Sequence, residues 1–213
     1  MKNLIIKEFR LAVHPTMWLF LLFSFMLLIP SYPYYVGFLY GCLAIFFTFQ
    51  NGRESRDIFY TALLPIRKRD AVTARFASVM LFELAQILVS VPIALLSRRI
   101  NPAGNAAGIE ANVAFYGLVF LMFGGYHLAF FPAFYRDAHS LTRSMLGGFS
   151  FVILYILVAE SLAQYIPGPI SDYLDRGSAA AQLPVLIAGI LLWLGASAWA
   201  WSISCRRFER VDL

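Results

Sequence analysis

The sequence predicts an all-α integral membrane protein with six transmembrane helices, an N-terminal interfacial helix and a short cytoplasmic helix between spans two and three. The composition is the first reason: 60% of the 213 residues are hydrophobic and 14% are charged, whereas soluble chains carry roughly 25% charged residues. Such a chain has too little polar surface to cover itself in water. The long apolar runs and the placement of lysine and arginine are the second and third reasons.

The first element is an amphipathic helix over residues 1–14. Polar residues recur at i, i+4, i+7 and i+11, and apolar residues fall on the opposite face, which is helical spacing. We expect it to lie in the cytoplasmic interface and to turn into the first span at Pro15. The polar face comprises Asn3, Lys7, Arg10 and His14, and the apolar face Ile5, Phe9, Ala12 and Val13.

Six apolar segments follow in a single transmembrane domain covering residues 1–213. Crossing about 30 Å of hydrocarbon takes about 20 helical residues. The first two segments are short, so by length alone they fit either two crossings or a partial hairpin. The third carries Arg75 and Glu83, which predicts a solvated start and a polar middle. The spans are predicted at residues 16–30, 34–50, 71–96, 112–134, 145–166 and 183–204.

The charge distribution gives the sidedness. If all six segments cross with the N-terminus inside, every lysine and arginine falls inside except Arg98, Arg99 and Arg176. This is the bias that the positive-inside rule demands of a protein with both termini in the cytoplasm. The net charge of +5 is therefore a topology signal, and no nucleic-acid partner is expected. A partial first hairpin would leave the same sidedness.

Several catalytic and binding motifs are absent from the sequence. It has no Gly-x-x-x-x-Gly-Lys-Ser/Thr loop for nucleotide phosphates and no His-Glu-x-x-His motif, and its three histidines are scattered. Cys42 and Cys205 cannot form a disulfide framework. Gly148-Phe149-Ser150-Phe151 lacks the second glycine of a serine elbow. We expect no catalytic residue, metal or cofactor on this chain.

Residues 51–70 form the longest polar insertion. Asn51-Gly52 is expected to end the second span, Asp57 to cap a short helix from Ile58 to Leu64 that Pro65 closes, and Asp70 to cap the third span. This short helix is apolar and aromatic. It fits either an interfacial helix dipping into lipid headgroups or a docking element for a cytoplasmic partner that moves spans two and three.

The stretch Leu63-Leu64-Pro65-Ile66-Arg67-Lys68-Arg69-Asp70-Ala71-Val72 opens the third span. With the N-terminal helix and six spans, it resembles the permease subunits of the ABC-2 (type-2 exporter) superfamily. Size and the near-absence of an extracellular domain look most like the small bacterial permeases that include the phenol-soluble modulin exporter. The family's short re-entrant helices between spans five and six have little room in residues 167–182.

The resemblance implies a half-transporter in the bacterial cytoplasmic membrane, with both termini inside. Two permease chains, identical or paralogous, would pair, and each would dock a separate ABC ATPase that holds ATP and Mg. The nucleotide-binding loop missing here would then lie on that partner. The coupling residues implied are Asp57, Ile58, Phe59, Tyr60, Thr61, Leu63 and Leu64.

Polar residues inside the spans are candidates for a translocation path, because a carboxylate in lipid must face protein, water or a proton. Glu83, Gln86, Ser90 and Ser97 form one stripe on the third span. The stripe fits either a path for cationic or amphipathic cargo or a packing face with interhelical hydrogen bonds. Further candidates are His127 and, near the outer end of its span, Glu160.

Small and aromatic residues within the spans suggest packing roles. Gly37 and Gly41 form a small-xxx-small pair that permits close helix approach, as in a dimer seam. Trp193, Trp199 and Trp201 fit interface anchors and packing bulk.

The function that these features favour is the permease of an ATP-driven exporter of amphipathic or hydrophobic peptides. One alternative is an ion-coupled secondary transporter with Glu83, His127 and Glu160 as a proton relay. The other is a membrane-embedded immunity or sensor subunit that binds peptides without moving them.

Overall fold

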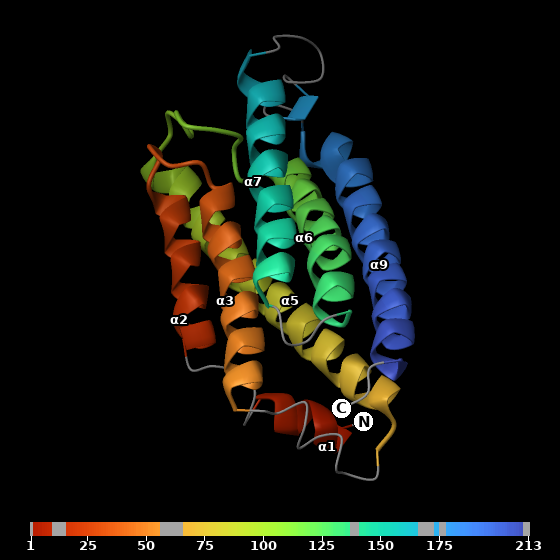
Figure 1. The fold of residues 1–213 in the computed structure, drawn as a ribbon. Coiled ribbons are helices and arrows are strands. Elements are labelled where there is room, and N and C mark those ends of the chain that lie inside the picture. The colour runs from red at the N-terminus through yellow and green to blue at the C-terminus, as the bar shows by residue number, and fades with distance from the viewer. Residues whose placement is uncertain are drawn as a thin grey trace.

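The computed structural model describes residues 2–9, 16–55, 66–136, 141–165, 173–174 and 178–210, and these ranges contain helices and turns but no strand. The helices run side by side in one bundle, with α1 across one end (Figure 1). Their bounds are α1 Lys2–Lys7, α2 Thr16–Leu21, the 3₁₀ helix η2 Leu22–Leu28, α3 Tyr35–Glu54, α5 Lys68–Ile100, α6 Val113–Phe134, α7 Leu141–Tyr165 and α9 Ala179–Glu209.

Four of these helices, α5, α6, α7 and α9, are long and apolar enough to cross a membrane. This confirms an all-helical, multi-pass architecture from residue 68 onward. Side chains cap two of them: Asn112 Oδ1 accepts the Phe115 N–H of α6 at 2.9 Å, and Ser178 Oγ accepts the Ala181 N–H of α9 at 3.3 Å. Both satisfy backbone donors that a helix start leaves without a partner.

Helix α6 is the centre of the bundle and packs against α9, α7 and α3. Its fully buried aromatic rings include Phe115, Phe123 and Tyr126. Backbones of α6 and α9 approach closely because glycines face each other: a Cβ built on Gly189 would lie 2.1 Å from the carbonyl oxygen of Gly117. Without a hydrophobic effect between helices in lipid, such close packing is what holds them together.

Helix α5 crosses the bundle diagonally (Figure 1). Near its start, Trp201 Nε1 of α9 donates to Thr73 Oγ1 at 3.0 Å. Near its end, the Ser97 hydroxyl donates to the Leu27 carbonyl of η2. Helix α5 therefore joins the N-terminal hairpin to the C-terminal helices.

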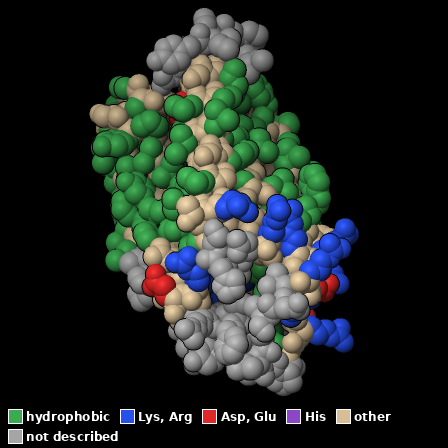
Figure 2. All heavy atoms as spheres, viewed as in Figure 1, with side chains coloured by type: hydrophobic (Ala, Val, Ile, Leu, Met, Phe, Trp, Pro, Cys, Tyr) green, Lys and Arg blue, Asp and Glu red, His purple; other side chains and the backbone are tan. Residues whose placement is uncertain are grey.

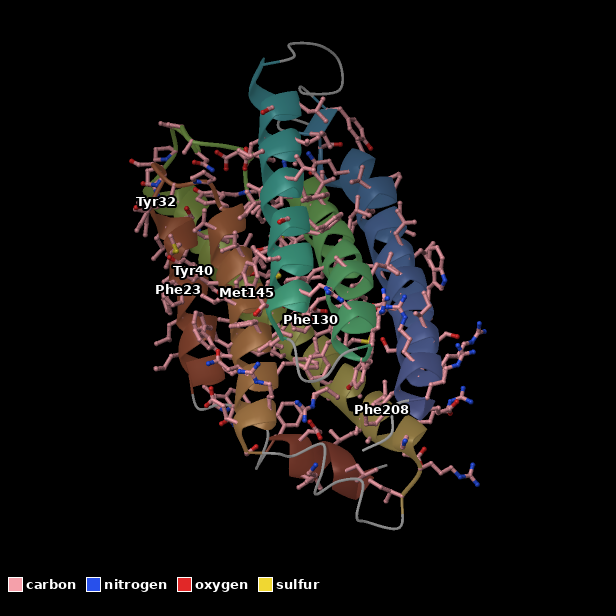
Figure 3. The ribbon with its side chains drawn as sticks, in the orientation of Figure 1. Phe23, Tyr32, Tyr40, Phe130, Met145 and Phe208 are labelled. Atoms are coloured by element: carbon pink, nitrogen blue, oxygen red, sulfur yellow. The ribbon has the colours of Figure 1, made fainter. Side chains whose placement is uncertain are left out.

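The predicted first two spans form a hairpin of α2–η2 and α3. Phe23 and Tyr40 stack across it with ring centroids 4.2 Å apart (Figure 3). Because a 3₁₀ helix rises about 2.0 Å per residue and an α-helix 1.5 Å, α2 with η2 extends about 23 Å and α3 about 30 Å. The Ala106 N–H in the α5–α6 loop donates to the Pro30 carbonyl at 3.0 Å. The hairpin turn therefore meets the loop that joins two long helices.

The side surface of the bundle is apolar, and lysine and arginine gather toward the end that carries α1 (Figure 2). Leu88, Leu191 and Trp199 are 74%, 63% and 64% exposed. An exposed apolar belt of this extent requires lipid or another protein around it.

Two predicted helix ends are wrong. Asn51-Gly52 does not end the second span: α3 continues to Glu54, and Gly52 lies where a Cβ would be 3.1 Å from Arg75 Nη1. This glycine makes room for a side chain and does not terminate the helix. Asp70 does not cap α5, because the helix starts at Lys68 and Asp70 sits in its first turn. There the carboxylate complements the helix dipole.

The predicted solvated start of the third span is also wrong at Arg75, which is 7% exposed. Its guanidinium pairs with Glu8, just after α1, and lies 5.2 Å from the centre of the Phe49 ring of α3. Arg75 thus holds α1, α3 and α5 together. Of the predicted 1–14 helix, residues 10–14 lie outside the described residues, as does the turn at Pro15.

Candidate functional site

The polar stripe of α5 points into the bundle. Glu83, Gln86 and Ser90 are each 0% exposed, and His127 of α6 is likewise 0% exposed. The i, i+3, i+7 spacing puts the three α5 side chains on one helix face, and that face packs against other helices of the same chain. The site is therefore built from interhelical contacts within one subunit.

Glu83 is the centre of a four-residue cluster. Its Oε1 lies 2.8 Å from His127 Nε2, and its Oε2 accepts the Trp193 indole N–H at 3.0 Å. His127 Nδ1 lies 2.8 Å from Ser197 Oγ on α9. Each carboxylate oxygen and each imidazole nitrogen therefore has a partner. We call Glu83, His127, Trp193 and Ser197 the Glu83 cluster.

One proton in the Glu83–His127 hydrogen bond makes this cluster neutral. The imidazole Nδ1–H then donates to Ser197, Nε2 shares the proton with the carboxylate, and the indole donates to the other oxygen. Neutrality matters because net charge in a hydrocarbon environment costs several kcal/mol. The cluster ties α5, α6 and α9 together.

Gln86 and Ser90 make separate contacts. Gln86 Nε2 donates to the Gly37 carbonyl of α3 at 2.8 Å. A Cβ on Gly41 would lie 2.0 Å from Gln86 Oε1, so the Gly37–Gly41 pair serves packing within this chain. Ser90 Oγ donates to the Ile87 carbonyl at 2.8 Å and lies 3.2 Å from the Tyr116 hydroxyl.

Glu160 lies elsewhere, on α7. Its Oε2 accepts the Ile109 backbone N–H from the α5–α6 loop at 3.0 Å. The Glu160 side chain therefore holds the α5–α6 loop. Of the predicted path residues, Glu83 and His127 are hydrogen-bonded to each other, and Glu160 is bound to a different element.

Trp193 and Ser197 are the functional-site candidates that the sequence reasoning missed. Trp193 was assigned to bulk packing or an interface, yet it is 3% exposed and donates to Glu83. Their i, i+4 spacing on α9 was the available signal. The other two tryptophans of α9 differ: Trp199 is exposed, and the Arg69 guanidinium lies 4.6 Å from the ring centre of Trp201.

The predicted coupling residues, from Asp57 to Leu64, lie outside the described residues. So do most of residues 167–182, where re-entrant helices were in question. Within the described ranges, no group of three or more histidine, cysteine, aspartate or glutamate side chains is placed to hold a metal ion.

A family model described as ABC-2 family transporter protein matches residues 3–209. The chain belongs to this family. Comparisons with curated proteins and with solved structures gave no significant match. Membership identifies a multi-pass membrane subunit of the ABC-2 permease type, a class that typically works with an ATPase subunit.

Proposed function

We propose that this chain is the permease subunit of an ATP-driven exporter in the bacterial cytoplasmic membrane, with amphipathic or hydrophobic peptides as cargo. Two such chains pair and form the path between them, and each binds a separate ABC ATPase that carries ATP and Mg²⁺. The observation that carries the proposal is the family match over residues 3–209. The small bacterial permeases named above remain the subgroup that we propose.

The contacts of Arg75 support a mechanical role for residues 51–70, which include the end of α3, the start of α5 and the connection between them. Arg75 sits two turns into α5 and contacts Phe49 and Gly52 near the end of α3, and its partner Glu8 follows α1. Because Arg75 links α1, α3 and α5, a displacement of one of these helices is expected to move the other two with it. This is the arrangement that a coupling helix from Asp57 to Leu64 requires.

We further propose that all six predicted segments cross the membrane, with both termini in the cytoplasm. The hydrogen bond between Ala106 and Pro30 supports this, because the loop between two long helices and the hairpin turn share one end of the bundle. The gathering of basic side chains near α1 supports the sidedness (Figure 2).

Glu83, Gln86, Ser90, His127 and Glu160 remain proposed path residues. In the conformation described, the first four are buried between helices of one chain. Glu83, Ser90 and His127 would reach cargo when α5 separates from α6 and α9, so the Glu83 cluster would close the path at rest. Glu83→Gln is then expected to change cargo-stimulated ATP hydrolysis, and an unaltered response counts against this role.

Affinity purification in mild detergent, from a host that expresses the neighbouring genes, tests the assignment. We expect an ABC ATPase to co-purify and to cross-link to residues 57–64. Tyr60→Asp should abolish this association while membrane insertion is retained. Tyr32→Asp is the matched control, because Tyr32 is 49% exposed at the end of the bundle away from α1 (Figure 3). Equal association of both variants would overturn the docking assignment.

The contact between Glu83 and His127 favours one second candidate, an ion-coupled transporter in which this pair carries the proton. Transport that survives ATP depletion and stops with a protonophore would support that function over the exporter. Peptide binding without stimulation of any partner's ATP hydrolysis would instead indicate an immunity or sensor subunit.

A further inference from the structure

An apolar groove runs between α5, α6 and α9 on the side of the bundle. It encloses about 360 Å³, and its walls are almost entirely hydrophobic side chains. Its lining from α5 includes Ile87, Val91 and Leu95. The Tyr116 ring lines it from α6, and Ile190 lines it from α9.

A polar cavity of about 630 Å³ adjoins the groove at the α5–α6 loop. Arg98, Asn112 and Val113 line both spaces, so the two meet at these residues. Beyond this junction the polar cavity is bounded by Glu110 and Gln182, which do not line the groove. The combined site changes from apolar to cationic to acidic along its length.

The length of the groove along α5 is about the thickness of the hydrocarbon part of one lipid leaflet. From Ile87 to Arg98 the α5 helix rises about 16 Å at 1.5 Å per residue, roughly half of the 30 Å hydrocarbon core. Arg98 therefore lies where the hydrocarbon ends when the far end of the groove lies near the bilayer midplane. A guanidinium at that level binds phosphate through several N–H donors at once.

We propose that this site binds a single phospholipid with an amine headgroup, as in phosphatidylethanolamine. One acyl chain lies in the groove, the phosphate binds Arg98, and the ammonium group meets Glu110. Phosphate and ammonium follow the acyl chain in the same order in which Arg98 and Glu110 follow the groove. Each of the two spaces, at about 360 and 630 Å³, is within the size range of ligand sites, about 300–1,000 Å³.

Each side chain keeps contacts that hold it in place for this role. One Arg98 nitrogen donates to the Ala111 carbonyl at 3.1 Å, and the guanidinium has further N–H donors. Glu110 Oε1 accepts the Asn105 backbone N–H. The inference needs only that α5, α6 and α9 cross a bilayer, so it does not depend on the exporter cargo.

Two pairs of adjacent residues on α5 provide matched variants. Leu95 lines the groove and Leu96 does not, although both are exposed, at 60% and 47%. Arg98 lines the cavities and the exposed Arg99 does not. Leu95→Trp fills the groove, and Leu96→Trp adds the same ring to the neighbouring surface.

The experiment uses the full chain in vesicles containing phosphatidylethanolamine with a photoreactive group in the acyl chain. Adducts are mapped by peptide mass spectrometry, and lipid retained in detergent is measured by native mass spectrometry. We expect adducts on groove residues, and about a tenfold loss with Leu95→Trp or Arg98→Gln, the factor that 1.4 kcal/mol gives. Leu96→Trp and Arg99→Gln should leave the adducts unchanged.

The headgroup assignment is tested by replacing the lipid with phosphatidylglycerol, which lacks the amine. Glu110→Gln keeps an oxygen for the Asn105 N–H, and we expect it to lower retention of phosphatidylethanolamine but not of phosphatidylglycerol. Equal effects on both lipids would overturn the ammonium contact. Adducts spread evenly over all lipid-facing helices, with equal labelling of the Leu95→Trp and Leu96→Trp variants, would overturn the site. Cross-linking of the Leu95→Cys variant to a second copy would also overturn it, since the groove would then be an interface between chains.

Discussion

At the scale of single residues, Glu83 shows how a carboxylate is accommodated in the middle of an apolar bundle. Its two oxygens meet His127 and Trp193 from two different helices, and no residue of the cluster is more than 3% exposed. In lipid, a polar side chain without such partners would be costly. We infer that the hydrogen bonds of Glu83 with these partners stabilise the fold more than its negative charge does.

This argument predicts a difference between two replacements of Glu83. In Glu83→Gln, the amide NH₂ donates to His127 Nε2, the amide oxygen accepts from Trp193, and Nδ1–H donates to Ser197, so all contacts persist. In Glu83→Leu, the buried donor of Trp193 loses its partner, at a cost of about 1–3 kcal/mol. Thermal unfolding in detergent should give Glu83→Gln near the parent and Glu83→Leu clearly lower. Equal losses would show that the charge is what stabilises the cluster.

At the scale of helices, close approach of α6 and α9 depends on glycines that meet backbone. A Cβ on Gly189 would be 2.1 Å from the Gly117 carbonyl oxygen, whereas a Cβ on Gly195 of the same helix has no neighbour within 4 Å. Backbone cannot rotate away as a flexible side chain does. Gly189 is therefore required for the close approach of the two helices, whereas Gly195 is not.

Gly189→Ala is expected to destabilise the protein by about 1–3 kcal/mol, because the helices must separate to admit the methyl group. Gly195→Ala is expected to be neutral or to stabilise by up to about 1 kcal/mol, because alanine has the higher helix propensity. Both are measured by thermal unfolding in the same detergent. A neutral Gly189→Ala would contradict the close α6–α9 contact.

The pairing of Glu8 with Arg75 links the N-terminal helix to α5. Both side chains are buried, at 5% and 8% exposure. Removing one partner of a buried ion pair leaves the other charge uncompensated and costs about 3–5 kcal/mol. We expect Arg75→Gln alone to destabilise strongly and the double variant Glu8→Gln/Arg75→Gln to regain most of the loss. If the double variant were no better than Arg75→Gln, the stacking of Arg75 on Phe49 would be the main contribution.

The sequence was sufficient to predict the helices that lipid dictates. A solvent of fixed thickness requires long apolar segments, so α6 was placed within a residue of its bounds, at 112–134 against Val113–Phe134. The contacts between helices were harder to predict from the sequence. That Trp193 would meet Glu83 depends on how α9 lies against α5, which no local pattern encodes. The burial of Arg75 could not be predicted from the sequence for the same reason, because its partner Glu8 lies almost seventy residues earlier.

For the whole molecule, the open question is whether the α2–η2 and α3 hairpin crosses the bilayer together with α5, α6, α7 and α9. Sidedness is the same for six or four crossings, so charge cannot decide. The position of the hairpin turn can, because Pro30 and Ala106 share a hydrogen bond at one end of the bundle. Tyr32 in that turn and Ala106 in the loop are both exposed. If all six segments cross, both reach the outer solution.

Single cysteines in a background without Cys42 and Cys205, both buried in the parent, test this on intact cells with a membrane-impermeant maleimide. We expect Tyr32→Cys and Ala106→Cys to be labelled from outside. Ser55→Cys, exposed beyond the end of α3, should be labelled only after the membrane is permeabilised. Labelling of Ala106→Cys without Tyr32→Cys would mean that the hairpin turn stays within the bilayer and that four helices cross. Labelling of Ser55→Cys from outside would reverse the sidedness and remove residues 51–70 from the reach of a cytoplasmic ATPase.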